Sequence, residues 1–249
     1  AEQERELADL EALAAGLVPE EASRLLSSIA GLRLETGRMD EAERLWRAAY
    51  KLQPDDLRSL NALLELMMKK GDVEGAKAAT ADIESIAGAG TARARVAQAG
   101  VRILEVRLAQ EKKELETGKV ELSRDEQRLL DEARNLLIEA ENDRPGWHLI
   151  QSYFAEIEGL KGNIPAAIDH LQRAMRMGPA NPDVVRQLVA LLYASNRLEE
   201  ARKALDSLGP DGLAGFERLS AEMELRAGRL DEAVAIAEKA VNLDSKNGG

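Results

Sequence analysis

An alanine recurs along this chain at an interval of about 34 residues, and this repeat constrains the fold more than any other feature. The steps between successive copies are 34, 57, 34, 34 and 32 residues. A turn-forming residue stands five positions before five of these alanines. A unit this short cannot bury its apolar face alone, so neighbouring copies must stack on it. The alanines are Ala42, Ala76, Ala133, Ala167, Ala201 and Ala233, and the turn residues are Gly37, Gly71, Gly162, Asn196 and Gly228.

Residues 23–56 have the pattern of two amphipathic helices joined by a tight turn. Apolar residues recur every three or four positions on both sides of Gly37, which is helical spacing around a breaker. Gly37 suits the left-handed conformation that ends a helix, and Asp40 suits the N-cap of the next one. Pro54 ends the second helix because proline lacks a backbone N–H group.

Five hexapeptides around the turns repeat with this period, and the chain resembles the tetratricopeptide repeat family, whose period is 34 residues. The resemblance covers nearly the whole chain. It implies an all-α fold, a right-handed α-solenoid of helical hairpins with one extended repeat that bears an insertion. The hexapeptides are GRMDEA (37–42), GDVEGA (71–76), GNIPAA (162–167), NRLEEA (196–201) and GRLDEA (228–233).

We expect one solenoid domain over residues 1–249. The chain starts at alanine and ends in KNGG, so we expect it to be part of a larger protein of the same family, and the compartment stays undetermined. A helix is expected over residues 3–17. The expected segments are a partial repeat or cap at 1–22, repeats at 23–56, 57–90, 91–147, 148–181, 182–213 and 214–246, and a tail at 247–249.

The third repeat is irregular, because the 57-residue step exceeds the period by 23 residues. We place the insertion at about 107–128 and predict a long first helix that runs from Thr91 to about Glu116. Gly118 suits the end of that helix, and Ser123 with Glu126 forms a capping box that starts the next. We expect the insertion to be a projecting hairpin. The leucines expected to zip it together are Leu104, Leu108 and Leu115 against Leu122, Leu129 and Leu130.

Composition and motifs argue against several classes of function. The net charge of −11 disfavours general nucleic-acid binding, which needs a basic surface. No apolar stretch approaches the length that spans a membrane, and the chain has no cysteine. His148 and His170 lack the spacing of a zinc site, and no phosphate-binding or nucleophile motif is present. We therefore expect no enzyme activity, no catalytic residues, no metal and no cofactor.

The family resemblance implies that the first helix of each repeat lines a concave groove for partner segments. It places an arginine on the groove in five of six repeats, and guanidinium groups capture carboxylates in a bidentate manner. The lysine and asparagine clamp of the chaperone-binding subclass is absent, because Ser27 and Gly31 stand at the matching places. The expected groove residues are Arg24, Arg58, Asn61, Glu65, Arg95, Arg102, Arg186, Tyr193 and Arg218.

The sequence therefore predicts a non-catalytic scaffold that binds a protein or peptide, with an acidic or C-terminal segment as the favoured occupant. An opposing interpretation is that these arginines are solvated or pair with neighbouring glutamates. Two alternative functions stay open. In the first, the chain is the regulatory or substrate-presenting arm of a larger enzyme. In the second, it is a structural module that associates with itself.

Overall fold

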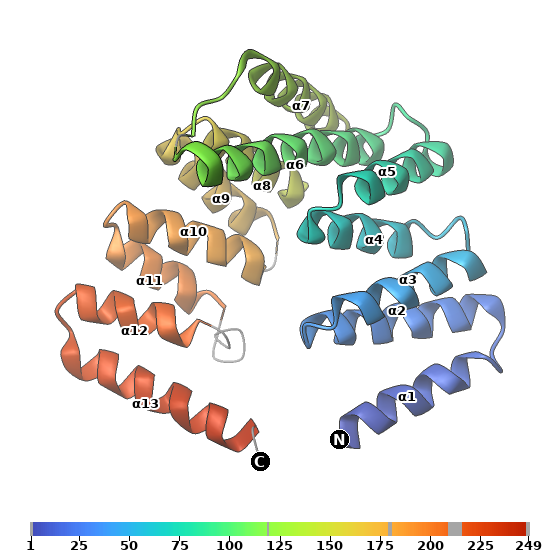
Figure 1. The fold of residues 1–249 in the computed structure, drawn as a ribbon, viewed down its shortest axis with the longest axis horizontal. Coiled ribbons are helices and arrows are strands. Elements are labelled where there is room, and N and C mark those ends of the chain that lie inside the picture. The colour runs from blue at the N-terminus through green and yellow to red at the C-terminus, as the bar shows by residue number, and fades with distance from the viewer. Residues whose placement is uncertain (1, 119, 179–180, 209–215, 248–249) are drawn as a thin grey trace. The chain divides into compact units, whose positions relative to one another are not determined.

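The computed structural model describes residues 2–118, 120–178, 181–208 and 216–247, and all regular secondary structure in this part is helical (Figure 1). This confirms the predicted all-α class. The helices are α1 (Glu2–Ala14), α2 (Pro19–Glu35), α3 (Met39–Leu52), α4 (Leu57–Lys70), α5 (Val73–Ala87), α6 (Ala92–Thr117), α7 (Arg124–Asp143), α8 (His148–Leu160), α9 (Ile164–Met177), α10 (Pro182–Ala194), α11 (Leu198–Asp206), α12 (Glu217–Arg226) and α13 (Leu230–Asn247).

The helices belong to two compact units, residues 1–145 with α1–α7 (unit 1) and residues 146–249 with α8–α13 (unit 2). Within each unit a helix packs mainly against its neighbours in sequence (Figure 1). The hairpins are α2–α3, α4–α5 and α6–α7 in unit 1, and α8–α9, α10–α11 and α12–α13 in unit 2. A single domain over 1–249 stays a prediction. The expected repeat boundary at 213–214 and the end of the tail lie outside the described residues.

The predicted turn residues occupy the left-handed region of the backbone. Gly37 has a φ of 77°, Gly71 of 69° and Asn196 of 58°, and Gly162 and Gly228 are also positive. Asn196 is the only non-glycine residue with positive φ in the described part of the chain. Glycine adopts this conformation without a Cβ penalty, and asparagine tolerates it better than most residues. Glycine or asparagine therefore recurs at these turns because the backbone there is left-handed.

The recurring alanines lie in the buried interior of their hairpins. Ala42, Ala76, Ala133, Ala167 and Ala201 are 0% exposed. Ala233 is also buried, at 8%. In a close-packed interior, an increase in side-chain volume of even one methylene group disturbs the packing. A larger side chain at these positions therefore has to push the paired helices apart, which accounts for the repeated alanine.

Two local predictions were wrong. Asp40 is not the N-cap of the second helix, because α3 begins at Met39 with Arg38 at the cap. Asp40 instead lies in the first turn of α3, and its Oδ1 atom lies 2.8 Å from Nζ of Lys70 in α4. The first helix ends at Ala14 rather than at residue 17.

The long hairpin of the third repeat forms as predicted at its ends but not along its length. Gly118 ends α6 with a φ of 66°, and Ser123 and Glu126 form the capping box of α7. Leu104 and Leu130 are buried. Leu115, however, is 89% exposed, so the predicted leucine zipper does not reach it.

Polar contacts hold the outer part of this hairpin instead. The carboxylate of Glu126 accepts hydrogen bonds from Gln110 Nε2 at 2.8 Å and from Lys113 Nζ at 2.6 Å, both on α6. It also accepts one from the backbone N–H of Ser123 at 2.7 Å. At its inner part α6 crosses the end of α4, where Arg107 Nη2 donates to the carbonyl oxygen of Met68 at 3.0 Å.

Substitution of two turn glycines should separate backbone strain from steric contact. Gly37→Ala should lower the free energy of unfolding by about 1–2 kcal/mol, because a Cβ is strained at positive φ. No heavy atom of the described residues lies within 4 Å of that Cβ. At Gly71 the added Cβ would lie 3.3 Å from Leu108 Cδ2. Gly71→Ala should therefore cost roughly 1 kcal/mol more. Urea denaturation of both variants tests this, and equal losses would contradict it.

Candidate partner-binding surface

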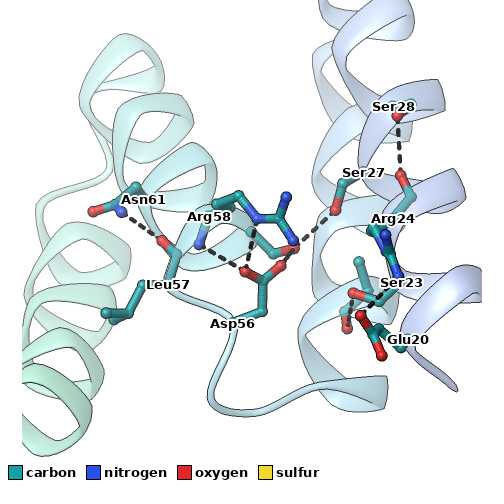
Figure 2. A network of polar contacts seen from close by, with 11 residues as sticks. Glu20, Ser23, Arg24, Ser27, Ser28, Asp56, Leu57, Arg58 and Asn61 are labelled. Atoms are coloured by element: carbon teal, nitrogen blue, oxygen red, sulfur yellow. Dashed lines mark hydrogen bonds and ion pairs between the residues drawn. The ribbon is translucent and has the colours of Figure 1, made fainter.

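Figure 2 shows Arg24 and Ser27 of α2 near Arg58 and Asn61 of α4, and we call the surface formed by these residues the α2–α4 face. That a groove runs over them stays a prediction. A chain of hydroxyl contacts connects the two helices. Ser27 Oγ and Ser59 Oγ lie 2.8 Å apart, and Ser59 Oγ donates to Asp56 Oδ2 at 3.1 Å. These bonds fix the spacing of the two helices from which the charged side chains project.

Asp56 positions Arg58 at the start of α4. Its side chain caps the helix by accepting from the backbone N–H of Arg58 at 3.1 Å, and it also accepts from Arg58 Nε at 3.2 Å. Partial burial alone raises the pKa of Asp56, but hydrogen bonds from Arg58 and Ser59 outweigh burial and hold the pKa below its usual value. Asp56 is therefore ionised at neutral pH.

The two arginines of this face are accessible. The Arg58 side chain is 73% exposed, and Arg24 is exposed beside Glu20, with 2.7 Å between Arg24 Nη2 and Glu20 Oε1. Asn61 Nδ2 donates to the carbonyl oxygen of Leu57, one turn earlier, and Glu65 is exposed on the same helix. Exposed ion pairs of this kind contribute only about 0–1 kcal/mol, so they restrain the guanidinium groups weakly.

The predicted groove arginines of the third repeat pair with acidic residues of α7. Arg95 Nε lies 2.9 Å from Glu139 of α7, and Arg95 also pairs with Asp143. Arg102 Nε lies 3.1 Å from Glu132 of α7. Both side chains are therefore engaged with the second helix of their own hairpin.

In unit 2, the predicted groove residues Arg186 and Tyr193 each form a cation–π pair that the sequence did not predict. The Arg186 guanidinium lies 4.9 Å from the ring centre of Phe216, and the Arg226 guanidinium lies 4.8 Å from that of Tyr193. Arg218 is exposed and lies 3.6 Å from Glu222 on its own helix. Helical spacing alone carried no signal for the two pairs, because they join separate helices.

Charge is segregated between first and second helices in the second and third repeats. Among first helices, α4 carries three basic and one acidic side chain, and α6 carries six basic and four acidic. Among second helices, α5 carries one basic and three acidic, and α7 carries three basic and seven acidic. In a chain of net charge −11, the first helices of these two repeats, α4 and α6, are thus locally basic.

The described residues offer neither a metal site nor a membrane-spanning helix. Among the described residues, no group of three or more His, Asp or Glu side chains is arranged to hold a metal ion. No helix in the described ranges is both long and apolar enough to cross a membrane. His170 Nδ1 lies 2.8 Å from Gln151 Oε1, and its ring packs 5.2 Å from that of Phe154, which are packing contacts between α8 and α9.

Comparisons with known proteins give the family. Two tetratricopeptide repeat models match residues 28–84 and 160–214. No curated protein sequence matches the chain at a significant level. Both matched stretches contain turn residues and buried alanines of the series described above.

Several solved structures share the fold at low sequence identity. TTC0263, a thermophilic tetratricopeptide repeat protein of Thermus thermophilus, is 18% identical with a TM-score of 0.58, and the match covers 86% of this chain and 99% of that one. The structure of the Cut9–Hcn1 tetramer of APC/C gives 14% identity and a TM-score of 0.56 over 94% and 44% of the chains. Pseudomonas aeruginosa pilF gives 17% and 0.50 over 90% and 93%.

Identities this low establish the architecture and no more. The repeat period, the left-handed turn residues, the buried alanines and the two family matches agree on that architecture. The chain carries tetratricopeptide repeats over residues 28–84 and 160–214.

Proposed function

We propose that this chain is a non-catalytic protein-interaction scaffold, and that its α2–α4 face binds an acidic segment of a partner protein. The observation that carries the proposal is the pair of exposed arginines, Arg24 of α2 and Arg58 of the locally basic helix α4, in a chain that is acidic as a whole. Repeat families of this type present extended surfaces to partners through stacked units, which supports the scaffold role.

Exchange of carboxylates is the proposed mechanism of binding. Glu20 holds Arg24 through an exposed pair of low net energy, so a carboxylate of the partner replaces it at little cost. The Arg58 side chain is 73% exposed and can bind a partner carboxylate while Asp56 keeps its cap on α4. Guanidinium groups bind carboxylates in a bidentate manner, which adds geometric specificity. The hydroxyl chain through Ser27 and Ser59 keeps the two arginines on a rigid base, so binding loses little conformational entropy.

The double variant Arg24→Ala/Arg58→Ala should bind a partner captured with the wild-type chain about tenfold more weakly, and the loss should shrink at high salt. Helicity by circular dichroism should not change, because both side chains are exposed. Arg47→Ala is the matched control, since Arg47 forms the same kind of i,i+4 pair, with Glu43, on the second helix α3. Calorimetric titration tests this. Equal affinities for the double variant and the control would refute the proposal.

A further inference from the structure

A hollow of about 400 Å³ lies between α5, α6 and α7 of unit 1. Helix α6 packs on both of the other helices (Figure 1), and the hollow opens among side chains from all three. Its volume lies within the range of about 300–1,000 Å³ that is usual for ligand pockets. The charged and hydroxyl residues that line it are Lys77, Thr80, Glu84, Arg102, Glu105 and Glu132.

The lining has one negative charge in excess. Lys77 Nζ lies 2.8 Å from Glu105, and Arg102 Nε lies 3.1 Å from Glu132, so two of the three carboxylates have a cation. Glu84 is different, because its contact is with the neutral amide of Gln98, whose Nε2 donates to Glu84 Oε1 at 2.7 Å. Helix α6 carries two more basic than acidic side chains, but α5 and α7 carry two and four more acidic than basic, so the three helices around the hollow together keep a negative charge.

A second feature of the hollow is an unpartnered hydroxyl. Thr80 is 6% exposed, and its Oγ1 makes no hydrogen bond with any described residue. Buried polar groups in native proteins are nearly always hydrogen-bonded, because loss of water without a replacement partner is costly. Thr80 Oγ1 is therefore available to a group that enters the hollow.

We propose that this hollow binds a lysine or arginine side chain of a protein partner, with the cationic group between Glu84 and the Thr80 hydroxyl. Val101 and Leu129 also line the hollow and supply apolar surface for the methylene stem of such a side chain. The lining residues come from α5, α6 and α7 and from neither helix of the α2–α4 face, and the hollow has the opposite charge preference. It is thus a second and independent recognition site, and Arg102, predicted for the groove, lines it.

Titration of the ¹⁵N-labelled chain with Nα-acetyl-arginine amide and Nα-acetyl-lysine amide tests this proposal. Both cations should give saturable shifts of the amide signals of Thr80, Gln98 and Leu129, with weak affinity because each probe is a single side chain. Nα-acetyl-citrulline amide has nearly the same shape as the arginine probe without its charge. It should bind at least about fivefold more weakly. Shifts that are absent, that lie elsewhere, or that are equal for the citrulline probe would overturn the proposal.

Variants distinguish the hollow from general attraction to an acidic chain. Glu84→Gln should weaken arginine binding about fivefold. Glu114→Gln is its matched control, because it removes the same charge from α6 outside the hollow and should not change the affinity for the arginine probe.

Ala81→Leu, at an exposed position on the rim, should fill the hollow and abolish the shifts. Thr80→Val keeps the side-chain shape and should weaken binding while the chain stays folded. Equal affinities for the wild type, Glu84→Gln and Ala81→Leu would refute the site.

Discussion

The Leu137→Ala variant should lose about 2–5 kcal/mol of the free energy of unfolding of unit 1, the range for a truncated, buried leucine. Leu137 is 0% exposed and belongs to the buried stripe of α7 together with Leu130, Ala133 and Ala140. Because this stripe is the surface that α7 packs against α6, the cavity would open inside the long hairpin. A loss of this size would show that the irregular repeat is part of the cooperative core.

The next residue along the helix supplies the control. Ile138 is 43% exposed, so Ile138→Ala should cost less than about 1 kcal/mol. Trp46 is buried in unit 1, whereas Trp147 lies in unit 2, so fluorescence in a Trp147→Phe background reports unit 1 alone. Denaturation in urea, followed by this signal, gives the comparison. If Leu137→Ala and Ile138→Ala lost the same stability, α7 would not pack as described.

The Glu126→Ala variant should lose about 2–4 kcal/mol, because three hydrogen bonds to a buried carboxylate disappear with the capping box. Its removal also leaves Gln110 and Lys113 of α6 without their acceptor. Glu114→Ala, at an exposed position of the same hairpin, should cost only about a few tenths of a kcal/mol. A Glu126→Ala loss as small as the control would mean that the outer hairpin contributes nothing to stability.

The stabilisation by Glu126 should depend on pH with a defined sign. Burial alone raises the pKa of Glu126, but hydrogen bonds from Lys113 and Ser123 outweigh it, and the pKa lies below its usual value. A group whose pKa is depressed by folding stabilises the folded state above its unfolded pKa, about 4.3 for glutamate. The stability difference between wild type and Glu126→Gln should therefore be constant from about pH 7 to about 5 and shrink at lower pH. A difference that grows on acidification would contradict this account.

The turns and the buried alanines could be predicted from sequence because their causes are local. A left-handed turn accepts glycine or asparagine almost alone, and a close helix crossing accepts a small residue alone. Gly118 and the Ser123–Glu126 capping box were predictable for the same reason, because cap chemistry is confined to a few neighbouring residues. Repetition of such local constraints with one period then gave the architecture.

The sequence could not predict features that depend on where the next helix begins or on which helix a side chain contacts. Helical spacing placed Leu115 on an apolar stripe, but α7 begins only at Arg124, and polar groups of Gln110 and Lys113 meet its first turn. Repeat alignment assigned Arg95 and Arg102 to the groove. It carries no information on their pairing with acidic residues of α7, because those partners lie on another helix. The groove set as a whole stays a prediction.

The division of charge in the second and third repeats connects these findings to binding. In these two repeats the first helices α4 and α6 are basic and the second helices α5 and α7 are acidic, so the surfaces of these helices favour partners of opposite charge. Complementary charge of this kind raises specificity and association rate more than affinity. Binding at the α2–α4 face should accordingly weaken as salt screens the exposed arginines.

Two synthetic peptides of equal length test the central claim most directly, one with Asp and Glu and the other with Lys and Arg at the same positions. Each is added to the ¹⁵N-labelled chain, and amide shifts are mapped onto the helices. The account predicts that the acidic peptide saturably shifts amide signals around Arg24, Ser27, Arg58 and Asn61, and that the basic peptide leaves them in place. Shifts of these signals by both peptides, or by neither, would contradict it.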